Sequence, residues 1–233
     1  MRPKIICVAL LLAFLLTGVE NASSQVQIGV RAGMNFAGLR LVNEVGERQE
    51  TGMIPRFQVG MTVEIPIAAD ISIQPAALYS GKGFKQNGGW LAESDLEFRA
   101  TASYIEIPVN LLYSPPLGSG NLIFGAGPYV GYATGGKWKA DQAHVLIGDI
   151  MIEPRGDVIF RSDVADGEFG NYLYGKPWDY GINLILGYEL MRGITMQLHG
   201  QFGAANLAPR IGGNSPTGSV RNKVYGISIG YKL

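Results

Sequence analysis

Apolar and polar side chains alternate with a period of two along most of this chain. Residues 194–202, for example, read Ile-Thr-Met-Gln-Leu-His-Gly-Gln-Phe. Successive side chains of a β-strand point to opposite faces, so this alternation predicts strands with one apolar and one polar face. Eight segments fit the pattern and are predicted to be strands: 26–39, 56–67, 71–84, 98–113, 121–137, 178–190, 193–206 and 222–233.

The apolar faces of these strands need a cover, and the sequence offers no amphipathic helix to supply one. A strand of about ten residues with alternating polarity is the unit of a transmembrane β-barrel, in which every backbone polar group is paired between strands. The sequence therefore predicts an all-β fold, an eight-stranded antiparallel up-and-down transmembrane β-barrel. Segment 222–233 is expected to close the barrel against 26–39, with the apolar faces toward lipid.

The connections between the predicted strands alternate in length. The short ones, at 68–70, 114–120 and 191–192, have turn-like chemistry. The long ones are 40–55, 85–97, 138–177 and 207–221. Short turns on one rim and long loops on the other are typical of outer-membrane barrels. This asymmetry predicts short periplasmic turns, long extracellular loops and both chain ends on the periplasmic side.

The amino-terminal segment has the layout of a secretory signal peptide. Arg2 and Lys4 precede an apolar run at 5–16, and small residues follow it. The run is shorter than the roughly twenty apolar residues of a membrane-spanning helix. We therefore expect a signal peptide at 1–24 and the barrel domain at 25–233.

Composition narrows the functional classes. Basic and acidic residues balance at 19 each, so the chain shows no nucleic-acid footprint. The single cysteine, Cys7, lies in the predicted signal and leaves no disulfide for the mature fold. With 33 glycines and 16% charged residues, and without a long apolar stretch after residue 25, a membrane protein of this composition is expected to be a barrel.

Aromatic residues are predicted to gather at the two ends of the strands. If successive strands run in alternating directions, these aromatic residues form two belts, which are typical of the two membrane–water interfaces. The outer belt comprises Phe36, Phe57, Tyr79, Tyr132, Trp178, Tyr180, Phe202 and Tyr225. The inner belt comprises Tyr113, Phe124, Tyr188 and Tyr231.

Eight strands enclose a lumen that side chains fill, so an open pore is not expected. Charges in such a lumen must be paired or hydrated. We predict a structural polar cluster of Arg31, Glu64, Glu106 and Glu189, with Arg31 within reach of one of the three glutamates. The small residues of 226–230 are expected to leave room for these side chains.

Several segments resemble one known family. They are Gly-Val-Arg-Ala-Gly-Met-Asn-Phe at 29–36, Ile-Gln-Pro-Ala-Ala-Leu-Tyr-Ser-Gly-Lys-Gly at 73–83, Tyr-Ile-Glu-Ile-Pro-Val at 104–109, Ala-Gly-Pro-Tyr-Val-Gly-Tyr at 126–132 and Gly-Tyr-Lys-Leu at 230–233. With these segments the chain resembles the outer-membrane β-barrel family of Bacteroidota that includes the PorT-like proteins. It departs from the family pattern at Ala76, where an acidic residue is common, and at Leu233, where an aromatic is common. The resemblance implies the fold and the cell outer membrane, and by analogy a role in assisting protein secretion.

No enzymatic constellation stands out. His144, with Asp141, Asp149 and Ser162 in the same loop, has no triad spacing, and His199 is expected to be a hydrogen-bonding residue of the lumen. We therefore predict no catalytic residues, no cofactor and no metal site.

The loop at 138–177 is the least ordinary connection, because loops of this length in compact domains are usually functional or disordered. Residues 145–152 and 157–161 are predicted to form a β-hairpin around a turn at 153–156. The tripeptide Arg155-Gly156-Asp157 is treated as a chance match. The acidic residues of this loop lack a calcium-loop pattern and are expected to form a solvated surface.

The leading functional hypothesis is a non-enzymatic, monomeric outer-membrane barrel that acts as a structural or interaction module and presents its loops to envelope or secretion proteins. Its partners would be outer-membrane lipid and such proteins, not nucleic acid. The alternatives are a narrow channel or small-solute binder that uses the polar lumen, and a secretion accessory factor. A soluble lipocalin-like carrier is a further contender, but it would require apolar faces inside.

Overall fold

The computed structural model describes residues 26–43, 45–89, 92–140, 145–147, 150–152, 154–165, 172–190 and 193–233. The predicted signal peptide at 1–24 and His144 lie outside these residues. No helix in the described ranges is long and apolar enough to cross a membrane.

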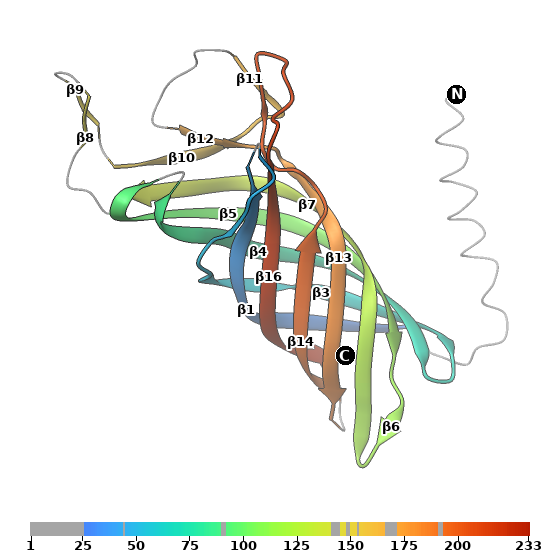
Figure 1. The fold of residues 1–233 in the computed structure, drawn as a ribbon. Helices are drawn as coiled ribbons and strands as arrows, with labels where there is room; N and C mark the ends of the chain where they lie inside the picture. Colours follow the sequence, from blue (N-terminus) through green and yellow to red (C-terminus); the bar gives the residue numbers. More distant parts are fainter. Residues whose placement is uncertain are drawn as a thin grey trace, which may run out of the picture.

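Eight long strands form a closed antiparallel ring in which each strand pairs with its neighbours in sequence (Figure 1). The ring closes where β16 pairs with β1, from Gly29 opposite Lys232 to Val42 opposite Ser219. All eight predicted strands and the predicted closure are confirmed. The strands are β1 (Gln27–Val42), β3 (Ile54–Ala68), β4 (Ile71–Gly89), β5 (Ala92–Tyr113), β7 (Gly120–Ala140), β13 (Trp178–Glu189), β14 (Ile194–Gly203) and β16 (Ser219–Lys232).

One end of the ring, here called the inner end, carries tight turns. β3 and β4 meet with Ala68 opposite Ile71. The connection from β5 to β7 is tightened by β6 (Pro116–Leu117), whose Leu117 lies opposite Gly120. Gly118 in this turn has a φ of 62°, a left-handed conformation that favours glycine. The opposite, outer end carries the longer connections.

One predicted loop is wrong. Residues 85–97 were expected to form a long connection, yet β4 and β5 continue and still pair where Gly89 lies opposite Ala92. Two ion pairs support this extension. Lys85 on β4 lies opposite Arg99 on β5, and both basic side chains contact the carboxylate of Glu97. β7 extends alongside, to Ala140 opposite Phe98. β4, β5 and β7 are therefore the longest strands of the ring, and we call the side of the ring that they form the tall wall.

The predicted hairpin at 145–161 is also wrong in its pairing. β8 (Val145–Ile147) pairs with β9 (Ile150–Ile152), and β10 (Arg155–Phe160) pairs instead with the outer part of β7. There Asp157 lies opposite Lys137, so the tall wall offers β10 a partner of opposite charge. β10 also runs parallel to β12 (Tyr172–Gly175), and both lie across the outer end of the ring (Figure 1). The remaining short strands are β2 (Arg48–Glu50), β11 (Asp163–Val164) and β15 (Arg210–Ile211).

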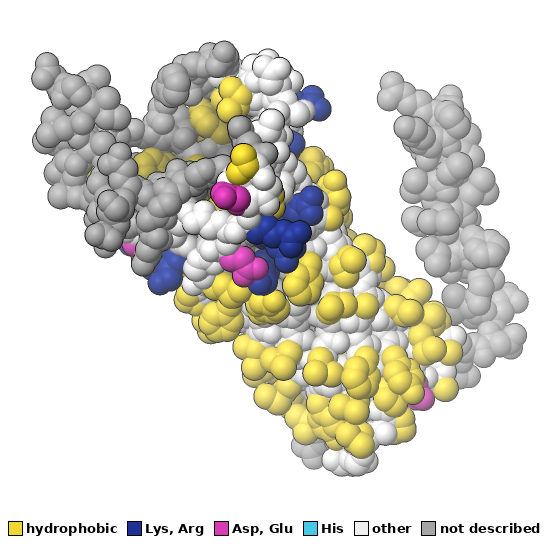
Figure 2. All heavy atoms as spheres, viewed as in Figure 1, with side chains coloured by type: hydrophobic (Ala, Val, Ile, Leu, Met, Phe, Trp, Pro, Cys, Tyr) yellow, Lys and Arg dark blue, Asp and Glu magenta, His cyan; other side chains and the backbone are white. Residues whose placement is uncertain are grey.

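The outward faces of the ring form an apolar band (Figure 2). Leu198, Ile227 and Ile229 are about half exposed, whereas Gln197 and Ser228 on the opposite face are buried. At the outer edge of the band, rings from neighbouring strands pack in pairs: Phe57 with Tyr79, Tyr132 with Trp178 and Phe202 with Tyr225. Outward apolar and inward polar faces are the reverse of a lipocalin, so the lipocalin alternative is not supported.

Beyond the outer aromatic belt the polarity of the ring inverts. Leu39 and Leu41 on β1 are buried inside, and Arg40 between them is exposed. Phe84, Phe98 and Ala100 join the same internal apolar cluster. We attribute the inversion to the change of surroundings: outside the strands there is lipid at the band and water above it, and apolar side chains avoid the water.

Candidate functional site

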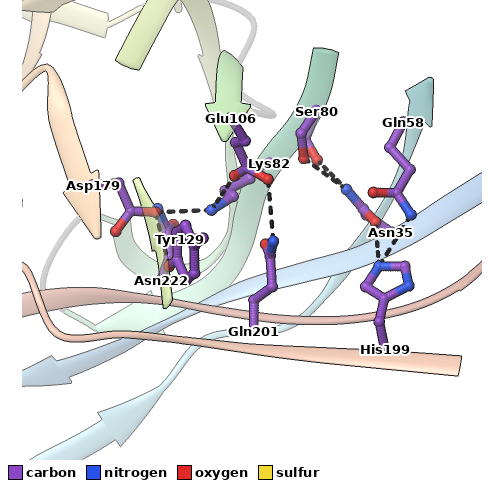
Figure 3. Close-up of polar contacts among 11 residues, drawn as sticks. Asn35, Gln58, Ser80, Lys82, Glu106, Tyr129, Asp179, His199, Gln201 and Asn222 are labelled. Carbon is purple, nitrogen blue, oxygen red and sulfur yellow. Dashed lines mark hydrogen bonds and ion pairs between the residues drawn. The ribbon is translucent and has the colours of Figure 1, made fainter. Parts of the chain in front are cut away.

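Three charged side chains meet inside the ring (Figure 3). The ammonium nitrogen of Lys82 on β4 lies 2.6 Å from a carboxylate oxygen of Glu106 on β5 and 2.8 Å from one of Asp179 on β13. All three side chains are fully buried. A buried ion pair of this kind is stable only when its partners are complete, because each lone ion would pay a large desolvation penalty.

Further side chains complete this centre, which we call the Lys82 centre. Tyr129 and Asn222 donate hydrogen bonds to Asp179, at 3.2 and 2.8 Å, and Gln201 donates one to Glu106 at 3.1 Å. The Lys82 ammonium also lies 4.6 Å from the centre of the Tyr129 ring, which adds a cation–π contact. Side chains from β4, β5, β7, β13, β14 and β16 thus meet at one level inside the lumen.

Arg31, the predicted cation of the lumen, points inward and is buried. Its guanidinium donates a 2.9 Å hydrogen bond to Gln197. In the described part of the chain it forms no ion pair with Glu64, Glu106 or Glu189.

A short polar chain lies next to Arg31. The His199 ring contacts the amide groups of Asn35 and Gln58 at 3.0 and 3.2 Å, and Asn35 donates to Ser80 (Figure 3). The position of His199 inside the lumen, among hydrogen-bonding amides, agrees with its predicted role.

The two remaining glutamates of the predicted cluster lie together at the inner end. Lys232 places its ammonium 2.9 Å from Glu64 and 2.6 Å from Glu189. Ser72 and Gln74 donate hydrogen bonds to Glu64. The structure therefore distributes the four predicted residues over three sites, and two of the glutamates share a cation that the sequence analysis did not include.

The lysines and Asp179 were missed for a simple reason. Lys82 lies an even number of residues from Gln74 and Ser80 on β4, so its side chain points to the same inward face. The alternation within the predicted strand 71–84 already places Lys82 on the inward face, although Lys82 was not included in the predicted cluster. The cross-strand meeting of Lys82 with Asp179, 97 residues apart, has no local signal in the sequence.

Glycine makes room for the lumen side chains at a different place from the one expected. A Cβ built on Gly226 would clash with the imidazole of His199 and approach the carbonyl oxygen of Met34. A Cβ built on Gly230 would lie 2.6 Å from the hydroxyl oxygen of Thr195, but 3.9 Å from the Cβ of Arg31. The small residues of β16 therefore accommodate His199 more than Arg31 and the glutamates.

This close approach predicts that Gly226→Ala destabilises the fold by about 1–3 kcal/mol, because the methyl group overpacks the lumen. Gly135→Ala is the matched control, since nothing lies within 4 Å of a Cβ at that position. Urea unfolding of both variants in lipid vesicles measures the difference. Equal stabilities for the two variants would show that the lumen around His199 is looser than described.

The lumen holds a polar network built around an ion-paired centre. In the Lys82 centre one ammonium contacts two carboxylates, and hydrogen bonds from Tyr129, Asn222 and Gln201 stabilise the extra negative charge. His199 contacts two amides through one ring nitrogen. No group of three or more potential metal-binding side chains occurs in the described residues. Of the four loop residues considered for a triad, only Ser162 lies within the described ranges, so the absence of catalysis stays a prediction.

The comparison with family models agrees with this architecture. A family model described as an outer membrane protein beta-barrel domain matches residues 20–208. Among solved structures, the chain is similar to Ail, the attachment invasion locus protein of Yersinia pestis, with 9% identity and a TM-score of 0.39, covering 90% of this chain and 100% of that one. The outer membrane protein OprG from Pseudomonas aeruginosa matches with 14% identity and a TM-score of 0.44, covering 89% and 95%. Neisserial surface protein A matches with 10% identity and a TM-score of 0.43, covering 90% and 100%. No curated protein sequence matches the chain.

Proposed function

Because this chain belongs to the outer membrane protein β-barrel domain family and is a protein of the outer membrane, we propose that it is a non-enzymatic structural and interaction module. In this proposal the ring is a monomeric transmembrane barrel that anchors an organised loop assembly at its extracellular end. The observation that carries the proposal is the Lys82 centre, in which side chains from six strands contact one another across the lumen. A lumen crossed by a buried, ion-paired network serves as a rigid anchor better than as a conduit.

The outer rim supports the proposed orientation. Arg40 on β1 lies directly opposite Arg221 on β16, and both are exposed just beyond the aromatic belt. Like charges opposite one another on a sheet repel, which disfavours the pair in isolation. Glu50 on β2 lies opposite Arg40 on its other side, and anionic lipid headgroups at the membrane surface would relieve the remaining repulsion. Figure 2 shows basic side chains gathered beside the upper edge of the apolar band.

The outer end carries the surface that a partner would meet. β10 and β12 run parallel across it, held by the pairing of β10 with β7. β11 pairs in parallel with β15, which ties the connection after β14 to the same assembly. Such pairing gives these connections a defined surface, which suits an interaction module.

A loop-replacement variant tests the interaction role. Residues 141–176 are replaced by a short glycine-serine turn between β7 and β13, which removes β10 and β12 and leaves the eight-stranded ring. The wild-type chain is expected to be cross-linked to an envelope protein in native membranes, and the variant is expected to lose that product. Both chains should keep heat-modifiable migration in detergent gels. Identical cross-linked products from both chains would contradict the proposal.

A small-solute binder is the second candidate, and one observation favours it. An open polar recess of about 510 Å³ lies at the inner end, lined by Glu64, Glu189 and Lys232 among others. A charged solute of the periplasm would meet these groups first. The secretion-accessory role implied by the resemblance to PorT-like proteins has no described contact that bears on it, and it stays a prediction.

A further inference from the structure

A cavity of about 250 Å³ lies inside the outer end of the ring, directly above the Lys82 centre. Its wall is formed by β1, β4 and β5, with Leu39, Leu41 and Phe84 among the lining residues. Its roof is formed by β10, β12 and residues 207–209, which contribute Val158 and Leu173. We call this cavity the outer chamber.

The lining of the outer chamber is almost entirely apolar, in contrast to the lumen below it. Protein interiors are normally packed as densely as organic crystals, with few voids larger than a water molecule. An apolar cavity of about 150 Å³ is already large enough to hold a benzene molecule. The outer chamber exceeds that size and lies near the lower end of small-molecule pockets, which begin at about 300 Å³.

The floor of the chamber defines the charge of its ligand. Lys82, Tyr104 and Asn222 border the chamber from below. The ammonium of Lys82 is already compensated by two carboxylates, and Asn222 donates its amide hydrogen to Asp179. The floor therefore offers no free positive charge to a carboxylate or phosphate. Thr101, Tyr174 and Lys176 also border the chamber, but polar atoms form only a small part of its lining.

The roof is tied to the tall wall and to the floor. Val158 packs against Gly136 of β7, where a Cβ on the glycine would lie 3.0 Å from the Cβ of Val158. The ring of Phe160 on β10 packs edge-on against that of Tyr104, with centroids 6.1 Å apart. These contacts keep the roof in place over the chamber while leaving the space between roof and wall open.

We propose that the outer chamber binds a small, uncharged, apolar molecule of one or two rings or a short hydrocarbon chain. The size of the chamber sets the bulk of this ligand, and the apolar lining sets its chemistry. The floor disfavours an anionic head group, because its one ammonium is already paired with two carboxylates. This binding site goes beyond the proposed role as an interaction module. It needs neither a protein partner nor an open lumen.

Methyl NMR of the protein in lipid nanodiscs tests the site with naphthalene as the probe. Labelled isoleucine, leucine and valine methyls report the chamber and the lipid face separately. Saturable shifts are expected at chamber positions, namely Leu39, Leu41, Val158, Leu173, Leu207 and Val220. Lipid-facing Leu198, Ile227 and Ile229 should show only the linear drift of a solute that partitions into lipid.

Two variants fill the chamber from different sides. Ala102→Phe adds a ring from the wall and Val158→Trp adds one from the roof, and each should weaken naphthalene binding by about tenfold or more, because the added ring takes the ligand's space. Ala32→Phe adds the same ring on the exposed face of β1 and should bind as the wild type does. Heat-modifiable migration checks that each variant is folded.

The outcomes separate clearly. Saturable chamber shifts that both filling variants weaken and Ala32→Phe preserves would support the proposal. Chamber methyls that do not shift, or that drift only in parallel with the lipid-facing methyls, would overturn it. Unchanged affinity in a folded Val158→Trp variant would overturn it as well. None of these results depends on whether the loop assembly has a protein partner.

Discussion

Lys82→Met is expected to lower the free energy of unfolding by about 3–5 kcal/mol, which is the usual cost of removing one partner from a buried ion pair. Methionine keeps most of the side-chain length but leaves the carboxylates of Glu106 and Asp179 buried without their cation. Both lie within 3 Å of the ammonium in the native protein. Reversible urea unfolding in lipid vesicles, followed by tryptophan fluorescence, measures this loss.

Neutralising both carboxylates should restore much of the stability. In the triple variant Lys82→Met, Glu106→Gln, Asp179→Asn, the unpaired charges are gone, and replacing a complete buried ionic group is often close to neutral. A triple variant as unstable as Lys82→Met alone would mean that the loss comes from packing around the lysine stem. In that case the three groups would not act as one ion-paired centre.

Leu198→Arg is expected to destabilise the fold by about 2–4 kcal/mol, as measured for arginine on the lipid face of a barrel near the bilayer midplane. Leu198 is 55% exposed and lies on β14 between the two aromatic belts. On a water-exposed surface the same substitution would change the stability little. The large cost therefore reports lipid outside this strand.

Ile211→Arg is the matched control for this substitution. Ile211 is 58% exposed, nearly the same as Leu198, but it lies on β15 in the outer loop assembly. Its replacement should leave the stability within about 0.5 kcal/mol, since water already surrounds it. Equal and small effects at both positions in vesicle unfolding would contradict the lipid-facing assignment of the band.

The alternation of side chains predicted the eight strands and their closure because strand pairing and side-chain direction follow from local sequence. This prediction failed where the surroundings of the strands change from lipid to water. Around Phe84 several inward side chains, such as Leu41 and Phe98, are apolar since water replaces lipid outside, although Gln86 on the same face is polar. This change of pattern resembles the end of a strand. The tall wall of β4 and β5 was therefore predicted to be a loop.

The lumen charges show a second limit. Alternation placed Glu64, Glu106 and Glu189 inside, but it could not predict which cation each would contact. That choice depends on how far strands are staggered around the ring, and stagger brings Lys82 to Asp179 and Lys232 to Glu64. Arg31 consequently has an amide partner, Gln197, rather than a glutamate.

The central claim is that the Lys82 centre closes the lumen, so that the barrel anchors and does not conduct. Planar-bilayer recording of the purified wild-type protein in concentrated potassium chloride tests this claim most directly. The account predicts a baseline without stepwise conductance after insertion, which is verified by recovering heat-modifiable protein from the membrane. Stable unitary steps from the folded wild-type barrel would contradict it and would favour the narrow-channel alternative.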